Sequence, residues 1–243
     1  MQRMLSFVRR AVDDYHMIAP GDRIAVGVSG GKDSVTLLAT LAALRRFYPN
    51  PFTLYAITLD MGFPDMDFSP IAAWCAQIDV PYTIVKTDIK QIIFDIRKEK
   101  NPCALCAKMR RGALHEAALN LGCKKVALGH HYEDAVETFF LSLFHEGRIH
   151  CFSPVTYLDR RDITVIRPLL YTPEGQVRGA VARLGLPIVR STCTADGNTQ
   201  RETVKQFVNA REQADHGFKQ RIFSAIQNSH IKGWQTDLSH EGR

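Results

Sequence analysis

The chain has 243 residues, of which 45% are hydrophobic and 23% charged, so it can bury an ordinary core and does not have a disordered composition. Its formal net charge of +6 is compatible with a polyanionic partner without requiring one. No stretch is apolar for 18 residues and the first residues do not resemble a signal peptide, so we expect no transmembrane helix and a cytosolic location.

Apolar stretches alternate with amphipathic ones along the chain, which is typical of an α/β fold. We expect strands over 23–29, 53–60, 82–88, 124–129 and 163–170. We expect helices over 7–18, 33–47, 70–78, 109–121, 133–144 and 174–184, then one long polar helix from Arg201. The pattern predicts a Rossmann-like, doubly wound, mainly parallel sheet. An N-terminal helix (1–20) would precede the main domain (21–200), and a C-terminal helix and loose tail (201–243) would follow it.

A glycine-rich stretch, "SGGKDS", joins the first expected strand to a helix. Glycines allow consecutive backbone N–H groups to point at one anion, and the helix N-terminus favours negative charge. The stretch is not a Walker A loop, because Val26 takes the first glycine position and Asp33 follows the lysine. A carboxylate beside a phosphate site indicates an intervening Mg²⁺. The expected phosphate-binding residues are Ser29, Gly30, Gly31, Lys32, Asp33 and Ser34.

Two further polar clusters follow expected strands, "DMGF" after the second and "GHHYED" after the fourth. In a doubly wound sheet the carboxyl ends of the strands form the ligand site. Asp60 and His130 are candidates for contacts with the nucleotide or its intermediate. Asp134 is a candidate for Mg²⁺ on the nucleotide side, or a helix-capping carboxylate; His131 is a weaker candidate.

The six cysteines are not expected to pair as disulfides in a reducing compartment. Cys103 and Cys106 form a C-x-x-C, which by itself is compatible with zinc, a redox disulfide or iron–sulfur ligation. No second pair follows, and Cys193 lies in an irregular polar stretch that makes it the best third ligand. Three thiolates suit a [4Fe–4S] cluster with one open iron, while a persulfide-carrying cysteine and a structural zinc remain alternatives. We interpret the remaining thiols as core fillers, namely Cys75, Cys123 and Cys151. The pattern favours this role for Cys151 without deciding it.

The loop "SGGKDS" resembles that of the ATP pyrophosphatase (PP-loop) superfamily. Together with the C-x-x-C before "RRGAL", "ALGHHYEDAVET", "VIRPLLY" and "CTADGNTQR", it resembles the tRNA 2-thiocytidine synthetase (TtcA-like) family over about 23–208. The resemblance implies ATP, Mg²⁺, a [4Fe–4S] cluster on Cys103, Cys106 and Cys193, a homodimer, and thiolation of a cytidine in the tRNA anticodon loop. It makes 21–200 the ATP-binding and iron–sulfur catalytic domain.

One departure concerns the late cysteine: family members carry a second C-x-x-C there, whereas this chain has Ser191 and Thr192 before a single Cys193. Three thiols still remain. The implied catalytic residues are Cys103, Cys106, Cys193, Lys32 and Asp134. The sulfur donor would be sulfide or a persulfide derived from a cysteine desulfurase.

Basic residues follow the C-x-x-C closely, namely Lys108, Arg110 and Arg111. They would bind the tRNA backbone, or form a solvated helix face. Arg167 and Arg201 enter only through the motif match. Two other functions remain open: thionation of a free nucleobase or other small molecule, and a non-catalytic iron–sulfur sensor.

Overall fold

A computed structural model describes residues 1–99, 102–193 and 200–236 of the chain. A six-stranded sheet has the order β3-β2-β1-β4-β6-β5. The strands are β1 (Asp22–Gly27), β2 (Phe52–Asp60), β3 (Tyr82–Lys86), β4 (Lys125–Ala127), β5 (Val155–Leu158) and β6 (Ile163–Ile166). Only the edge strand β5 runs antiparallel to its neighbour among these six, so the predicted fold class is confirmed.

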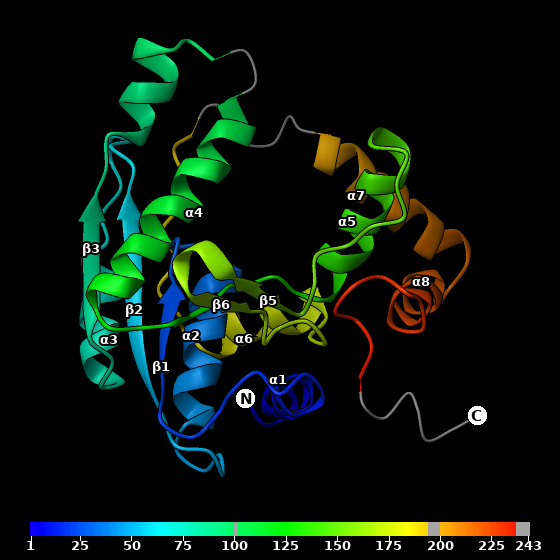
Figure 1. Cartoon of the computed structure of the whole chain (residues 1–243), viewed down its shortest axis with the longest axis horizontal. Helices are drawn as coiled ribbons and strands as arrows, with labels where there is room; N and C mark the ends of the chain where they lie inside the picture. Colours follow the sequence, from blue (N-terminus) through cyan, green and yellow to red (C-terminus); the bar gives the residue numbers. More distant parts are fainter. Residues whose placement is uncertain (100–101, 194–199, 237–243) are drawn as a thin grey trace.

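Helices cover both faces of the sheet (Figure 1). The α-helices are α1 (Gln2–Asp14), α2 (Lys32–Leu44), α3 (Ser69–Gln77), α4 (Pro102–Asn120), α5 (Tyr132–His145), α6 (Glu174–Leu184), α7 (Gln200–Ala214) and α8 (Phe218–Gln227). A π-helix, η1 (Gln91–Ile96), and a 3₁₀ turn, η2 (Asp159–Arg161), complete the described elements.

The alternation of apolar residues along β1 explains the two layers. Ile24 and Val26 face the larger core, which includes residues of α1, α2, α5 and α8, while Ala25 faces a smaller core beneath α4. Leu114 and Ala118 of α4 complete that smaller core. The sheet is therefore buried on both faces, as expected for parallel strands.

The C-terminal region differs from the expectation of one long helix and a loose tail. Gly217 adopts φ +86° and ends the run, so that α8 folds back on α5 and α7. Glu212 stabilises this corner by accepting hydrogen bonds from the N–H groups of Gly217 and Lys219. Trp234 is fully buried and its indole N–H donates to the carbonyl of Phe152 at 2.8 Å, so this part of the tail packs in the core.

The N-terminal helix also ends earlier than predicted, at Asp14 rather than near residue 18. Met17 and Ile18 are buried outside the helix, where they fill the larger core. No helix in the described ranges is long and apolar enough to cross a membrane. The predicted division into 1–20, 21–200 and 201–243 remains a prediction; α1, the sheet and α8 contribute to one hydrophobic cluster.

Candidate active site

The glycine loop connects the end of β1 to the first residue of α2, as predicted. Gly31 is extended and caps the helix, while Gly30 adopts φ +88°. A Cβ at Gly30 would lie 2.9 Å from Cβ of Val189, so this position requires glycine for both its conformation and its close contact. The hydroxyls of Ser29 and Ser34 lie 3.1 Å apart and bond within the loop. The turn thus presents a helix N-terminus, which favours an anion by about 0.3–1 kcal/mol.

A second loop, after β4, packs against the same helix start. A Cβ at Gly129 would lie 3.0–3.1 Å from the backbone of Asp33 and Ser34, so the two loops are in direct contact. Because β1 pairs with β2 on one side and β4 on the other, this contact marks the topological switch point of the sheet. The sequence therefore predicted correctly which strand ends meet.

Two carboxylates hold Lys32. Its Nζ lies 2.9 Å from Oδ2 of Asp33 and 3.2 Å from Oε1 of Glu174, the first residue of α6. Burial would lower the pKa of Lys32, but the two carboxylates raise it above its ordinary value. Lys32 is therefore a fixed cation beside the loop. We did not single out Glu174 from the sequence, because nothing in "YTPEGQ" shows that α6 begins at this site.

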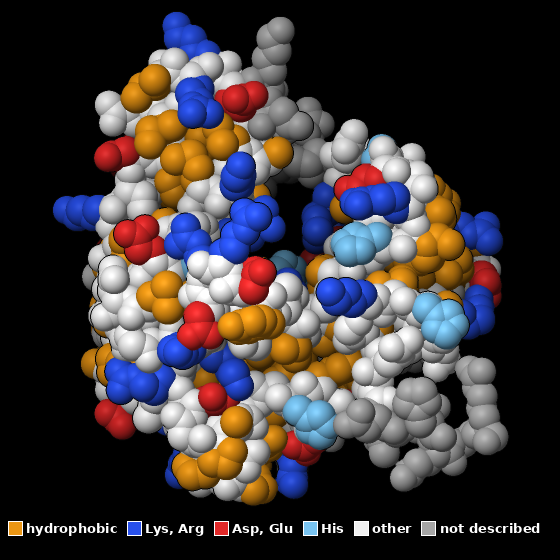
Figure 2. Space-filling view, in the orientation of Figure 1, with side chains coloured by type: hydrophobic (Ala, Val, Ile, Leu, Met, Phe, Trp, Pro, Cys, Tyr) orange, Lys and Arg blue, Asp and Glu red, His pale blue; other side chains and the backbone are white. Residues whose placement is uncertain are grey.

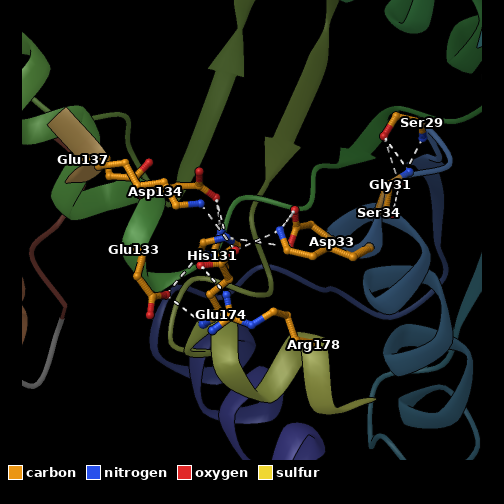
Figure 3. Close-up of polar contacts among 12 residues, drawn as sticks. Ser29, Gly31, Asp33, Ser34, His131, Glu133, Asp134, Glu137, Glu174 and Arg178 are labelled. Carbon is orange, nitrogen blue, oxygen red and sulfur yellow. Dashed lines mark hydrogen bonds and ion pairs between the residues drawn. The ribbon is translucent and has the colours of Figure 1, made fainter. Parts of the chain in front are cut away.

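His131 is the centre of the polar network shown in Figure 3, between residues of the loop and of α5. Its Nδ1 lies 3.2 Å from Glu133, and its Nε2 lies 3.5 Å from Asp134 and 3.7 Å from Asp33. Burial alone would lower the pKa of His131, but these carboxylates raise it. His131 therefore joins the glycine loop to α5, although the sequence pattern favoured its neighbour His130 as the site residue.

His130 has a different environment. Its ring packs 5.0 Å from that of Phe152, and its Nδ1 is buried with no hydrogen-bond partner. Burial, then the charge of Arg167, lowers the pKa of His130 to about 4, so the imidazole is neutral near pH 7. A neutral ring supplies no positive charge to a phosphate; its predicted contact with the nucleotide or intermediate remains a prediction.

Both carboxylate oxygens of Asp134 are engaged. Oδ2 accepts the backbone N–H of His131 at 2.8 Å, and Oδ1 pairs with Arg201 of α7 at 2.9 Å. The capping alternative for Asp134 is therefore observed, while its predicted role on the nucleotide side remains open. Arg201 also approaches Glu137 at 3.8 Å. Burial raises the pKa of Glu137 to about 7.

Two other sequence candidates lie near the strand ends. Asp60 ends β2, and its Oδ1 accepts the N–H of Gly62 at 3.0 Å, which stabilises the turn. Arg167 follows β6, donates to the carbonyl of Ser153 at 2.5 Å and lies 4.9 Å from the ring of Phe152. Asp60 thus has a structural contact already, and its contact with a nucleotide remains a prediction.

The six cysteines are all free, and they divide as expected into three buried and three accessible thiols. Cys103 is exposed and Cys106 is half-buried in the first turns of α4, and Cys193 is also half-buried. Burial raises the pKa of Cys106; Arg110 opposes this, and the nearby thiols of Cys193 and Cys103 raise it further. The buried thiols belong to Cys75, Cys123 and Cys151.

Two contacts bring the distant Cys193 to this end of α4. The hydroxyl of Thr192 donates to the carbonyl of Pro64 at 2.9 Å, and Sγ of Cys106 lies 4.0 Å from Sδ of Met61 in the same loop. Among the described residues, no three His, Cys, Asp or Glu side chains are already arranged to hold a metal ion. The donor set fits an iron–sulfur cluster in kind and in proximity, but its ligand geometry is not preassembled. Residues 194–199, which include most of "CTADGNTQR", lie outside the described ranges.

The fold and the glycine loop define a PP-loop ATP-binding protein, and the family model described as "PP-loop domain" matches residues 4–212. A tRNA-cytidine(32) 2-sulfurtransferase of Acaryochloris marina is 40% identical over 228 residues, which cover 93% of this chain and 81% of the relative. The enzyme with the same description from Pelobacter propionicus is 37% identical, covering 94% and 86% of the two chains. The chain therefore belongs to the tRNA-cytidine(32) 2-sulfurtransferase family, as the sequence motifs indicated.

A solved structure supports the fold independently. The U34-tRNA thiolase NcsA of Methanococcus maripaludis, solved with its [4Fe-4S] cluster, superposes with a TM-score of 0.75 at 23% identity. The match covers 90% of this chain and 76% of NcsA. At this identity the likeness concerns the fold.

Proposed function

We propose that the chain is an ATP-dependent sulfurtransferase that converts a cytidine of the tRNA anticodon loop, at position 32, into 2-thiocytidine. The observation that carries this proposal is the 40% identity to a tRNA-cytidine(32) 2-sulfurtransferase over 81% of that relative. The site supports it because it combines an anion-binding loop with three accessible thiols near the same edge of the sheet.

The loop residues would bind and orient ATP. The backbone of 29–31 and the start of α2 receive the phosphates, and the fixed cation of Lys32 stabilises their charge. Asp33 and Asp134 both approach Nε2 of His131, so two carboxylates already lie close to one another around a single ring nitrogen. Carboxylates with phosphate oxygens suit Mg²⁺, which we assign to these two residues.

The reaction has two balanced steps. The cytosine O2 attacks the α-phosphorus of ATP, pyrophosphate leaves, and an adenylated base forms. Sulfur then bonds to C2, and the C2–O2 bond breaks with departure of AMP. Neither step changes the oxidation state of the base when the sulfur arrives as sulfide.

A [4Fe–4S] cluster held by Cys103, Cys106 and Cys193 would supply an open iron position for a sulfur nucleophile. That NcsA, a protein of this fold, holds such a cluster supports the proposal. The three cysteines would hold the cluster beside the nucleotide, and the charge of Arg110 would stabilise the thiolate of Cys106. We further propose a homodimer and a donor that is sulfide, or a desulfurase-derived persulfide that an external thiol reduces by two electrons to release sulfide.

The test is thiolation by anaerobically purified protein with ATP, Mg²⁺, sulfide and unmodified tRNA, followed by nucleoside analysis and by assay of AMP and pyrophosphate. We expect 2-thiocytidine equal to AMP, about four irons per chain, and loss of activity in Lys32→Met. In Cys103→Ser, iron and activity are lost together. Product on free cytidine but not on tRNA, or iron without AMP formation, would refute the proposal in favour of a small-molecule enzyme or a sensor.

A further inference from the structure

A row of exposed cations runs over α4 and continues onto η2. Lys108, Arg110 and Arg111 are exposed on α4, and Arg160 and Arg161 are exposed on η2. Within residues 1–99, 102–193 and 200–236, none of the five takes part in an ion pair. Some exposed cations elsewhere do, for example Lys124 with Asp162 and Arg148 with Glu146. We call these five residues the α4–η2 row. The gathering of five such cations on two adjoining elements distinguishes the row from isolated solvated cations.

Helix geometry and electrostatics show that the row is continuous. Arg111 and His115 are four residues apart on α4 and therefore neighbours on one face. The pKa of buried His115 is lowered by burial, then by Arg161 and Arg111, so both guanidinium groups lie near it. Arg111 also lowers the pKa of Arg167 at the end of β6, after the larger effect of burial. Two elements that are about 50 residues apart in sequence thus place cations around one point.

The other end of the row reaches the cysteines. Arg110 acts electrostatically on Cys106, which lies one turn before it on α4. From Cys106 to His115 the helix advances about 14 Å, at about 1.5 Å per residue. The row therefore leads from the thiols, along α4, to η2, which directly precedes β6.

Like charges that gather without acidic partners repel one another and lower the stability of the fold. Such a cluster is understandable when a polyanion neutralises it. Figure 2 shows Lys and Arg side chains over α4 on the rim of a hollow between α4 and the α5–α7 pair. A nucleotide whose phosphates lie on this rim would face the hollow.

We propose that the α4–η2 row binds the phosphate backbone of the RNA segment that leads away from the target nucleotide, so that Arg111 and Arg161 fix how the substrate crosses the enzyme. This inference rests on the proposed function, since it requires an RNA substrate. RNA is favoured over an acidic protein because the row is a strip of guanidinium groups that begins beside the thiols, where the target base must arrive. Phosphate contacts of this kind position a substrate without reading its sequence.

The test compares Arg111→Gln/Arg161→Gln with Arg46→Gln/Arg183→Gln, a control that removes the same charge. Arg46 and Arg183 are also exposed and lie at or near the C-terminal ends of α2 and α6, which pack on the face of the sheet opposite α4. The affinity for tRNA is measured between about 50 and 300 mM salt, a range over which the screening length shortens markedly, together with thermal unfolding and thiolation. We expect the first pair to weaken tRNA binding about tenfold or more and to reduce the salt slope by about 2, with a melting temperature no lower than wild type. The control should retain wild-type affinity.

The outcomes separate this inference from the proposed function. If wild-type protein thiolates tRNA but the Arg111/Arg161 pair binds it with unchanged affinity and slope, the inference is wrong and the function stands. If that pair slows only thiolation driven by a cysteine desulfurase, and not by sulfide, the row binds the donor protein instead. Loss of affinity with an equal loss in the control, or with a lower melting temperature, also refutes a local phosphate contact. If wild-type protein neither binds nor thiolates tRNA, the proposed function itself fails.

Discussion

Replacement of Gly30 by alanine should impair both the phosphate-binding loop and the nearby cysteine site. Alanine at φ +88° costs about 1–2 kcal/mol relative to glycine. Its Cβ would lie 2.9 Å from Cβ and 3.1 Å from the carbonyl oxygen of Val189, and such overpacking costs about 1–3 kcal/mol. The sum predicts a loss of about 2–5 kcal/mol in the free energy of unfolding.

The displaced neighbour makes the functional effect broader than the loop. The N–H of Val189 donates to the carbonyl of Gly30 at 3.0 Å, and Cys193 follows only four residues later. We therefore expect Gly30→Ala to lower ATP affinity and the iron content of anaerobically prepared protein together. Urea unfolding, ATP titration and iron determination measure the three effects.

Gly112 provides the matched control for this substitution. It lies inside α4, an added Cβ there would meet no atom within 4 Å, and its φ is not positive. Gly112→Ala should leave ATP binding unchanged and stabilise the chain by up to about 1 kcal/mol. If Gly30→Ala unfolds at the same urea concentration as wild type and binds ATP equally well, the argument from backbone conformation and close contact is refuted.

Three other changes test the electrostatics and the packing. Burial raises the pKa of Glu137 from 4.5 to about 7, so the stability that its protonated form contributes is complete below pH 4.5 and is lost as the pH rises through about 7. The variant Glu137→Gln should therefore gain stability over wild type between pH 5 and 8, by at most about 3 kcal/mol. An equal difference in thermal unfolding at all pH values would contradict this. The variant Cys75→Ser should lose about 1–3 kcal/mol of unfolding free energy, because a buried hydroxyl replaces a fully buried thiol, and should keep its iron. The variant Cys103→Ser, at an exposed position, should remain as stable as wild type and lose its iron. The reverse pattern in unfolding and iron assays would overturn the assignment. Trp234→Ala should lose about 3–5 kcal/mol in urea unfolding, and an unchanged midpoint would mean that the tail does not stabilise the core.

Local patterns identified most of the sheet and the edge where the site lies. The short apolar runs before "SGGKDS" and "GHHYED" predict strands, and the rule for doubly wound sheets then places both clusters at one switch point. The contact of Gly129 with Asp33 confirms that placement. These features are local in sequence, which is why they were predictable.

Features that depend on tertiary packing were missed. The edge strand Val155–Leu158 has no fully buried residue and therefore lacks the apolar pattern of its neighbours; it is held by pairing with β6. The break at Gly217 was overlooked because one glycine in a polar run does not show that Phe223 and Ile226 must be buried. Glu174 joins the site only because α6 begins beside α2. Such contacts between distant segments leave no local pattern.

The polar groups of the site are largely bonded to one another, and this has a consequence for ATP binding. Lys32 contacts Asp33 and Glu174, while His131 lies among Asp33, Glu133 and Asp134. Phosphates that bind Lys32 must therefore replace a carboxylate, and the displaced carboxylate of Asp33 becomes available to a cation. The net charge around the loop changes less when nucleotide and Mg²⁺ arrive together than when the nucleotide arrives alone, and either one alone leaves charges in the site without a partner, which is costly. On this reasoning ATP and Mg²⁺ bind to the loop cooperatively, and the acidic surroundings of Lys32 are a requirement of the site.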